Sequence, residues 1–245
     1  MEIRQIRDIT IIDYDHKSYL GIACDSCGGI GYKEHDLVKA SPQLTAYHTG
    51  KVVLAELMSM GFTPFILADG LAVEMNDTGR QLIEGFNEVL SKLSFNVHLT
   101  GSTEENIKTV QTSMGVTCIG FCSKDKLKFK RTKTGDICLL VGLPMVGNEV
   151  LQNPDKILDI DDFEKLFLCD YINEMLPIGS RGIECELNDL LKDNKLKFEY
   201  ESSISIDLKK SGGPSTSCLV TLRMENLGII KGIIKKPINV IGSFL

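Results

Sequence analysis

The chain has 245 residues, of which 43% are hydrophobic and 24% charged, with 22 glycines and 7 prolines. This composition is that of an ordinary globular protein, and it excludes disordered, collagen-like and coiled-coil classes. The formal net charge is −6, and the one dense basic run, 124–133, reads as the solvated face of a strand or hairpin. We therefore expect no nucleic-acid partner, although a phosphate-facing role for that run is the alternative.

The first 150 residues alternate segments typical of strands with segments typical of helices. A helix is predicted over 42–60, where Ser41 suits the N-cap, Pro42 the first helical position and Gly61 the end. A second helix is predicted over 82–93, whose apolar residues follow a 3.6-residue repeat. The buried stripe of the first helix is predicted to comprise Val53, Leu54, Leu57 and Met58. Strands are predicted at 9–12, 19–24, 62–68, 95–100, 116–122 and 137–141.

The rest of the chain forms a smaller second part, which begins near Asn153-Pro154-Asp155. Its helices are mixed with strands at both short and long spacing, which favours an α+β fold over a strictly alternating parallel sheet. We draw the two domains as residues 1–147 and 148–245. In the second part, helices are predicted at 162–175 and 183–191, a loop at 211–214, and strands at 198–208, 218–222 and 238–241.

The eight cysteines lie mostly in apolar runs, where a free thiol packs as a small hydrophobe. Residues 1–4 lack the pattern of a signal peptide, so a reducing cytoplasm is expected, and no apolar stretch reaches the roughly 18 residues of a membrane span. Cys24 and Cys27 form a CxxC, but no second ligand pair follows at zinc spacing. A redox or thiolate-metal role for this pair is the less favoured alternative.

The most unusual segment runs from Asp25 through Gly28, Gly29 and Gly31 to Lys33. Glycines let backbone N–H groups approach phosphate oxygens closely, the lysine adds a point charge, and the leading carboxylate suits a divalent cation. The segment is neither a P-loop nor a GxGxxG dinucleotide motif. A purely structural turn is the alternative.

Three further acids lie within or at the ends of predicted elements: Glu56, Asp69 and Glu105. A carboxylate on the apolar face of a helix, as at Glu56, is costly unless it is paired or bound to a metal. Several carboxylates around one cavity repel each other unless a cation lies among them. With Asp25, these acids are the predicted ligands of Mg²⁺, although each one taken singly is more commonly a capping or surface residue.

Taken in order, these motifs resemble those of the aminoimidazole-ribonucleotide-synthetase-like superfamily, which includes thiamin-monophosphate kinase and selenophosphate synthetase. The family's early motif, roughly D-G-V-G-T-K, resembles the segment 25–33 in a stretched form. Its acid-bearing helix, followed by G-x-x-P, an apolar run and an Asp, resembles 56–69. Its G-x-T-x-E stretch matches Gly101, Thr103 and Glu105, and so implicates Thr103 in cofactor binding.

The resemblance implies an N-terminal α/β domain that binds Mg²⁺ and ATP and a short ferredoxin-like C-terminal domain. It also implies a homodimer in which strands of both subunits build a shared barrel. The chain lacks the reactive cysteine of selenophosphate synthetases before Ile9, and the paired aspartates of thiamin-monophosphate kinases at 23–26. Segments 25–31 and 211–216 resemble the α-ribazole kinase branch, which acts in salvage of the lower ligand of cobalamin.

We therefore predict an ATP-dependent kinase that phosphorylates a small nucleoside-like alcohol, with α-ribazole as the leading acceptor. Phosphoryl transfer needs positioning and charge neutralisation rather than a covalent nucleophile. Alternatives are a non-catalytic or regulatory nucleotide-binding protein on the same fold, another ATP-dependent enzyme of the superfamily, and, for 211–216, a plain β-turn. The predicted catalytic residues are Asp25 and Lys33, the cofactor-binding residues Gly28, Gly29, Gly31, Thr103, Gly212 and Gly213, and the metal ligands Asp25, Glu56, Asp69 and Glu105.

Overall fold

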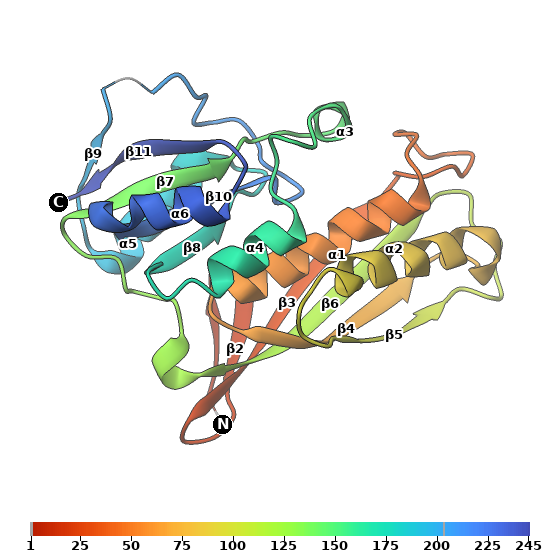
Figure 1. Ribbon diagram of the computed structural model, residues 1–245. Coiled ribbons are helices and arrows are strands. Elements are labelled where there is room, and N and C mark those ends of the chain that lie inside the picture. The colour runs from red at the N-terminus through yellow and green to blue at the C-terminus, as the bar shows by residue number, and fades with distance from the viewer. Residues whose placement is uncertain (1, 203) are drawn as a thin grey trace. The chain divides into compact units, whose positions relative to one another are not determined.

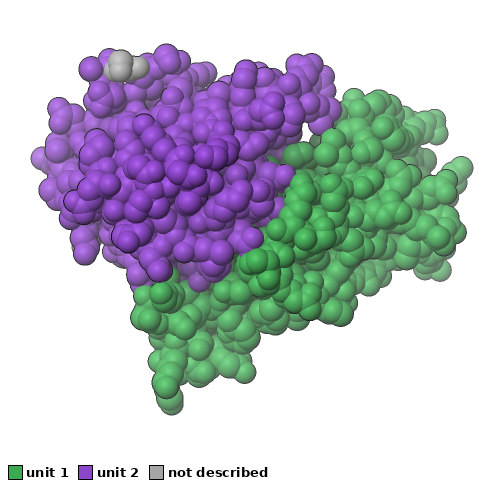
Figure 2. Space-filling view, in the orientation of Figure 1, with its two compact units in different colours: residues 1–58, 62–126 green, residues 59–61, 127–245 purple. Residues whose placement is uncertain are grey.

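The structure is a computed structural model that describes residues 2–202 and 204–245. The chain divides into two compact units, coloured separately in Figure 2. Unit 1 comprises Met1–Met58 and Phe62–Lys126, and unit 2 comprises Ser59–Gly61 and Leu127–Leu245. The units therefore change at Lys126/Leu127 rather than at the predicted 147/148, because the strand Asp136–Gly142 pairs only with strands of unit 2.

Unit 1 contains a six-stranded mixed sheet with the strand order β1-β2-β3-β6-β4-β5. The pair β4 and β5 is parallel and the other neighbours are antiparallel. The strands are β1 (Ile3–Ile6), β2 (Ile9–Asp13), β3 (Ser18–Gly28), β4 (Thr63–Leu71), β5 (His98–Thr103) and β6 (Ser113–Ser123).

Two long helices, α1 (Pro42–Ser59) and α2 (Arg80–Ser91), lie on one face of this sheet (Figure 1). A short π-helical turn, η1 (Met75–Gly79), precedes α2. The α1 stripe predicted from the sequence is fully buried, as are Leu82, Phe86 and Val89 of α2. The end signals at Ser41, Pro42 and Gly61 therefore identified α1, hydrophobic periodicity identified α2, and the predicted buried stripe of α1 is confirmed.

Unit 2 contains a five-stranded antiparallel sheet with the order β8-β10-β7-β11-β9. The strands are β7 (Asp136–Gly142), β8 (Glu174–Pro177), β9 (Phe198–Tyr200), β10 (Ser217–Arg223) and β11 (Ile238–Phe244). The helices are α3 (Asn148–Gln152), α4 (Ile160–Phe167), α5 (Ile183–Asn194) and α6 (Leu227–Ile233), with 3₁₀ turns at Lys124–Lys126 (η2, in unit 1) and Met224–Asn226 (η3). Its main core joins α5 to the strands through Leu140, Leu176, Leu187, Leu190, Leu219 and Phe244.

Three predictions differ from the structure. The helix predicted over 162–175 ends at Phe167, and its last residues begin the fully buried strand β8; a short buried apolar run has no periodicity that separates helix from strand. The strand predicted over 198–208 ends at Tyr200, and Ile204, Ile206 and Leu208 pack against the main core of unit 2 instead. The basic run 124–133 forms a 3₁₀ turn and a loop, and the strands and helices β1, α3 and α6 were not predicted.

All eight cysteines are free thiols, and five of them are buried, as their apolar settings predicted. Cys24 and Cys27 are three residues apart in β3, so their side chains point to opposite faces of the sheet and cannot form one thiolate site. In the described part of the chain, no helix is long and apolar enough to cross a bilayer.

Candidate functional site

Two of the predicted metal ligands lie in one row across the sheet of unit 1. Asp25 of β3 is opposite Val116 of β6, and Val116 is opposite Asp69 of β4. Residues directly opposite each other in antiparallel strands project to the same face. Val116 is 2% exposed and Asp69 9%, so this is the helix-covered face. Two strand spacings place the α-carbons of Asp25 and Asp69 about 10 Å apart.

The carboxylate of Asp69 occupies the space above Gly101 of β5. A Cβ added at Gly101 would lie 2.0 Å from Asp69 Oδ1, so only glycine leaves room for the acid. Burial raises the pKa of Asp69 to about 6, although the backbone N–H of Ser102 donates to the carboxylate and opposes the shift. This contact explains the glycine of the G-x-T-x-E stretch.

Asp25 is likewise a partly buried carboxylate. Burial raises its pKa, and the backbone hydrogen bond from Ser26 lowers it only in part. Within the described residues, neither Asp25 nor Asp69 forms an ion pair. A divalent cation beside them would offset the cost of burying two carboxylates, and carboxylate oxygens are the donors that Mg²⁺ prefers. The chemistry of Asp25 and Asp69 therefore suits a divalent cation such as Mg²⁺.

Thr103 and Glu105 lie at the same end of the sheet. Asp69 and Leu71 of β4 are aligned with Gly101 and Thr103 of β5, so Thr103 follows on the face that carries Asp69. Thr103 Oγ1 donates to Glu105 Oε1 at 2.7 Å, and the backbone N–H of Met75 donates to the same oxygen at 3.3 Å. One carboxylate oxygen of Glu105 is thus engaged by the chain itself.

Glu56 is the predicted ligand that the structure does not bring to this end. The hydroxyl of Thr49 bonds the thiol of Cys27, which places that part of α1 over the end of β3. Glu56 is seven residues further along α1, a rise of about 10 Å. No group of three or more His, Cys, Asp or Glu side chains in the described chain is arranged to hold a metal ion, so the predicted four-carboxylate cluster is not assembled.

Lys33 is fixed by residues that the sequence analysis did not identify. Its Nζ donates to Glu74 Oε2 at 2.6 Å and to the carbonyl oxygen of Thr109 at 3.1 Å. Thr109 in turn donates to Glu74 from its backbone N–H at 2.8 Å and from its hydroxyl at 2.8 Å. The bond from Lys33, with those from Thr109, holds the pKa of Glu74 far below its usual range. Lys33 and Glu74 are therefore an ion pair at neutral pH.

The backbone of the glycine-rich loop at 29–38 is hydrogen-bonded within unit 1. Its N–H groups donate from Gly29 to Thr112 O at 2.8 Å, from Gly31 to Val38 O at 3.0 Å and from Lys33 to Asp36 Oδ2 at 2.8 Å. Gly28 belongs to β3 and is aligned with Ser113. The predicted phosphate cradle therefore has no free N–H at Gly29 or Gly31, and the loop instead fixes the position of Lys33.

Asp36 closes this loop. It is 4% exposed and accepts from the backbone N–H of Thr112 at 2.8 Å and from the Thr112 hydroxyl at 2.7 Å. Burial alone raises the pKa of Asp36, but the bonds from Thr112 and Lys33 bring it below its ordinary value. A Cβ at Gly31 would lie 2.3 Å from Thr112 Oγ1 and 2.6 Å from Asp36 Oδ2. We call the hydrogen bonds of Asp36 with Thr112 and Lys33 the Asp36 clamp. Only glycine at position 31 leaves room for it.

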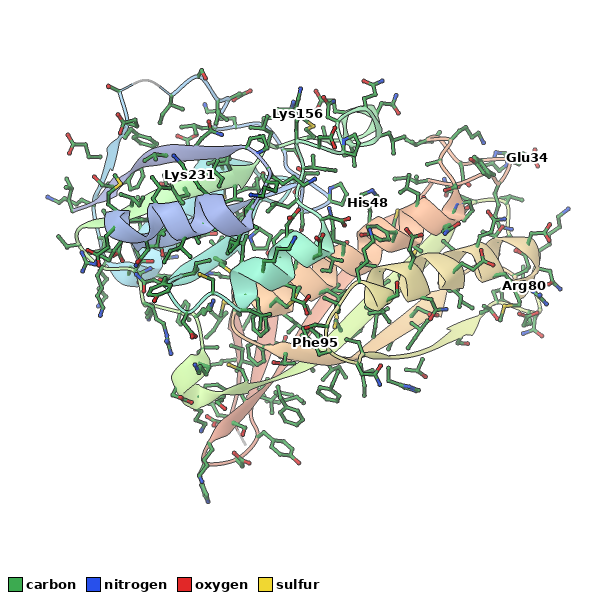
Figure 3. All side chains as sticks on the ribbon, viewed as in Figure 1. Glu34, His48, Arg80, Phe95, Lys156 and Lys231 are labelled. Atoms are coloured by element: carbon green, nitrogen blue, oxygen red, sulfur yellow. The ribbon has the colours of Figure 1, made fainter. Side chains whose placement is uncertain are left out.

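We call this group of residues the carboxyl-end cluster, because β3, β4 and β5 all end there. Glu34 of the loop and Arg80 at the start of α2 mark this end in Figure 3. Glu74, Thr109, Asp36 and Thr112 were missed because their partners are distant in sequence; the acid that follows the apolar segment 71–73 was the available signal for Glu74. The cluster comprises Asp25 and the segments 29–38, 69–75 and 101–112.

Gly212 and Gly213 belong to unit 2, where three loops meet at the start of β10. Gly212 N–H donates to the carbonyl of Gly179 at 3.1 Å. The Thr216 hydroxyl donates to Gly212 O at 2.9 Å and accepts from Met145 N–H at 3.0 Å. We call these loops, residues 142–147, 178–182 and 211–217, the glycine-loop cluster.

A buried hydroxyl without a partner lies in the glycine-loop cluster. Ser217 is 0% exposed, and its Oγ forms no hydrogen bond within the described residues. Ser217 is aligned with Gly142, and the backbone N–H of Ile178 donates to its carbonyl at 2.9 Å. Ser217 has the same strand face as Leu219, which packs against α5. The hydroxyl is therefore directed to the side of the sheet where α5 begins, after Gly182.

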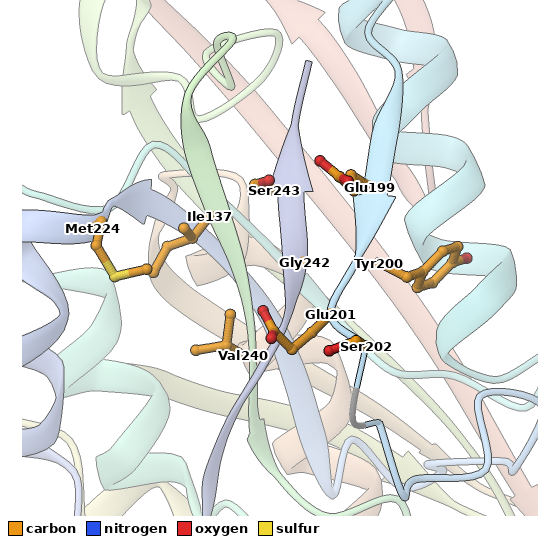
Figure 4. A pocket seen from close by; sticks show the side chains of 9 residues that line it. All are labelled: Ile137, Glu199, Tyr200, Glu201, Ser202, Met224, Val240, Gly242 and Ser243. Carbon is orange, nitrogen blue, oxygen red and sulfur yellow. The ribbon is translucent and has the colours of Figure 1, made fainter.

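A cavity of about 300 Å³ lies elsewhere in unit 2 (Figure 4). Glu199 and Glu201 contribute carboxylates to it, and Met224 and Val240 contribute apolar surface. It contains no lysine or arginine and none of the predicted site residues. Two carboxylates and no cationic side chain make this cavity unsuited to phosphate. The candidate site is the carboxyl-end cluster, because burial raises the pKa of both Asp25 and Asp69 there.

No protein-family model matches the sequence, and no curated protein matches it either. Solved structures do match. Thiamine monophosphate kinase from Aquifex aeolicus is 15% identical with a TM-score of 0.67, covering 98% of this chain and 89% of that one. The kinase from Stenotrophomonas maltophilia K279a is 14% identical with a TM-score of 0.68, covering 99% and 88%. PurL from T. maritima, complexed with AMPPCP, is 14% identical with a TM-score of 0.69, covering 96% of this chain and 42% of that one.

The chain therefore has the fold of thiamine-monophosphate kinase and PurL, both members of the aminoimidazole-ribonucleotide-synthetase-like superfamily. The resemblance deduced from the order of the sequence motifs is confirmed at the level of the fold. A mixed α/β architecture with two sheets is likewise confirmed. At 14–15% sequence identity, similarity of structure identifies the fold alone, because one fold can support many activities.

Proposed function

We propose that the protein is an Mg²⁺- and ATP-dependent phosphotransferase whose acceptor is a small alcohol. The observation that carries this proposal is the row formed by Asp25, Val116 and Asp69, in which two desolvated carboxylates share one face without an ion-pair partner. The same fold has been solved with the ATP analogue AMPPCP in thiamine-monophosphate kinase and in PurL. Both lines of support favour a phosphate-bearing ligand held through a cation.

In the proposed site, Asp25 and Asp69 hold Mg²⁺, and Glu105 lies at the same end of the sheet, with its Oε1 engaged by Thr103 and Met75. When bound, the ion neutralises charge on the phosphates and on the group being transferred. Lys33 contributes a further positive charge at the same end of the sheet, and Thr103 fixes Glu105 by its hydroxyl. We assign Glu56 no role in binding the ion, since α1 carries it away from this end.

Gly212 and Gly213 are proposed as a second loop that contacts nucleotide or substrate. The unpartnered hydroxyl of Ser217 supports this role, because a buried polar group is normally hydrogen-bonded and a ligand would provide the missing partner. Gly213 leaves open space at its Cα: a Cβ there would meet only Ser211 Oγ, at 3.9 Å. Backbone at such a position is accessible to a ligand.

For the acceptor, α-ribazole is the first compound to test, on the strength of the segments 25–31 and 211–216. Isothermal titration calorimetry with Mg–ATP, followed by a transfer assay with α-ribazole and, separately, with thiamine monophosphate, separates the possibilities. We expect Mg–ATP to bind and phosphate to be transferred to α-ribazole, whereas transfer to thiamine monophosphate, whose hydroxyl is already esterified, would refute an alcohol acceptor. Binding without transfer to any alcohol would favour a regulatory nucleotide-binding protein, and absence of Mg–ATP binding would refute the proposal.

Asp69→Asn tests the metal ligand directly. We expect Mg–ATP affinity to fall by at least about tenfold, because a neutral amide is a poor ligand for Mg²⁺. Asp161→Asn is the matched control, since Asp161 forms an exposed ion pair with Lys165 in α4. Equal affinities in both variants would exclude Asp69 as a ligand.

We further propose a ferredoxin-like assignment for unit 2 and a homodimer for the protein. The order β8-β10-β7-β11, with helices between β7 and β8 and between β10 and β11, supports the first assignment. The face of the unit 1 sheet opposite α1 and α2 carries Ile22, Ile66 and Ile119 in one row, beside Phe121, which is 39% exposed. An apolar face of this kind favours association of two copies, which sedimentation velocity would detect.

A further inference from the structure

Lys33 enters the carboxyl-end cluster from one loop, and its ammonium group is fixed there by a residue of another. On the basis of the proposed function, in which Lys33 binds phosphate, we propose that Glu74 is a positioning residue. Together with Thr109 it orients the Lys33 ammonium, so that two N–H groups are engaged by the chain and the third is left for a phosphate oxygen.

The hydrogen bonds of the Lys33 ammonium show why two of its N–H groups are engaged and one is left. An ammonium group has three donors. In the described chain, two of those of Lys33 are used, by Glu74 Oε2 at 2.6 Å and by Thr109 O at 3.1 Å. The side chain of Lys33 is 14% exposed and that of Glu74 24%, so water competes only weakly for the pair. One donor therefore remains, with its direction set by the other two.

Glu74 can orient Lys33 because it is itself fixed. Both of its oxygens accept from Thr109, one from the backbone N–H and the other from the hydroxyl. The backbone of Lys33 is tied separately, through its N–H to Asp36. A lysine side chain loses rotamer entropy when it is immobilised. Here that loss is incurred during folding, so ligand binding does not incur it again.

Charge and position make opposite predictions for Glu74→Gln. The substitution removes a negative charge beside a phosphate site, so electrostatics alone predicts tighter binding of Mg–ATP. Loss of orientation predicts weaker binding and a mobile Lys33. Thr109→Val removes one of the bonds that hold Glu74 without changing any charge, and Thr109→Ser restores the hydroxyl.

The first experiment measures acylation of Lys33 by an amine-reactive acetyl ester, followed by mass spectrometry. We expect the labelling rate of Lys33 to rise at least about fivefold in Glu74→Gln and Thr109→Val, and to remain near the wild-type rate in Thr109→Ser. The exposed pair in α4 supplies the control, because Asp161→Asn should leave Lys33 labelling unchanged. An unchanged rate in both Glu74→Gln and Thr109→Val overturns the inference.

The second experiment titrates the same variants with Mg–ATP. We expect the Kd to rise about tenfold in Glu74→Gln and Thr109→Val and to recover in Thr109→Ser. Affinity equal to or tighter than wild type in Glu74→Gln shows a charge effect only, and refutes positioning. If wild-type protein binds Mg–ATP and Lys33→Met weakens it while Glu74→Gln does not, this inference fails alone. If wild type binds no Mg–ATP, the proposed function fails, and the labelling result still decides whether Glu74 holds Lys33.

A variant that does not fold would be seen in its melting curve. In that case Glu74→Asp, which keeps the charge but draws the carboxylate back by one methylene, replaces Glu74→Gln. We expect intermediate labelling of Lys33 in Glu74→Asp. Wild-type labelling in a folded Glu74→Asp, together with wild-type labelling in Thr109→Val, counts against the proposal.

Discussion

The carboxyl-end cluster of unit 1 and the glycine-loop cluster of unit 2 are both rich in glycine, but they are held together differently. In unit 1 the loops are joined by charged groups: Asp36 ties the loop 29–38 to Thr112, and the pair of Lys33 and Glu74 ties the same loop to the segment 69–75. In unit 2 the loops are joined by hydrogen bonds between uncharged groups, which centre on the hydroxyl of Thr216. A glycine-rich segment in the sequence therefore says little about how its backbone donors are used.

The largest expected difference between the two clusters lies in their central polar residues. Asp36→Ala removes a buried carboxylate that accepts three hydrogen bonds and leaves the Thr112 N–H unpaired, so the free energy of unfolding at pH 7 should fall by about 3–4 kcal/mol. Thr216→Val removes neutral bonds and should cost about 1–2 kcal/mol. Urea denaturation of the two variants measures both values.

The Asp36 effect should also depend on pH. Because the folded protein lowers the pKa of Asp36, its contribution to stability is present above the unfolded value of 3.8 and is lost as pH falls through the folded one. The stability difference between wild type and Asp36→Ala should therefore shrink between about pH 5 and pH 3. A difference that stays constant over this range would contradict the clamp.

The glycines of the two clusters should respond differently to alanine. A Cβ at Gly31 meets the clamp atoms at 2.3 and 2.6 Å, whereas at Gly213 the nearest atom is 3.9 Å away. We expect Gly31→Ala to destabilise unit 1 by about 2–3 kcal/mol and Gly213→Ala to leave stability nearly unchanged. If Gly213 approaches a ligand, its variant should instead weaken nucleotide binding. Melting temperatures and Mg–ATP titrations of the two variants measure these effects.

Asp69→Asn should separate stability from binding in unit 1. Because burial raises the folded pKa of Asp69 to about 6, its ionisation costs stability as pH rises through that value, and the cost is absent below the unfolded pKa of 3.8. In EDTA at pH 7.5 the variant should therefore be more stable than wild type by about 1–2 kcal/mol, and the gain should vanish near pH 4. Thermal unfolding at both pH values measures it. A variant that is less stable at pH 7.5 would show that the carboxylate is satisfied without a cation.

The smallest effect is expected at Ser217. Its buried hydroxyl has no partner in the described residues, so Ser217→Ala should change stability by less than about 1 kcal/mol, in the favourable direction. A comparison of ligand-free melting temperatures tests this. A clear loss of stability would mean that the hydroxyl has a partner in the folded chain, and would remove the support that it gives to a ligand site in unit 2.

Local patterns predicted much of the fold. End signals identified α1 and the apolar 3.6-residue repeat identified α2, because both kinds of signal are local to the chain. The start of the four-residue strand β8 was assigned to a predicted helix, because a short strand buried on both faces shows no alternation of apolar and polar residues. The division between the units was misplaced because β7 pairs with strands that lie more than 70 residues further along.

The order of the acids and glycines along the chain was enough to indicate the fold. Which of these residues meet depends on the tertiary structure. It placed Asp25 and Asp69 on one face through the register of β6, kept Glu56 apart from them on α1, and engaged the loop N–H groups that had been expected to bind phosphate. Strand register and loop-to-loop hydrogen bonds join residues far apart in the chain: Asp25 and Val116 are 91 positions apart, Lys33 and Thr109 are 76, and Glu74 and Thr109 are 35. No local pattern records such pairs.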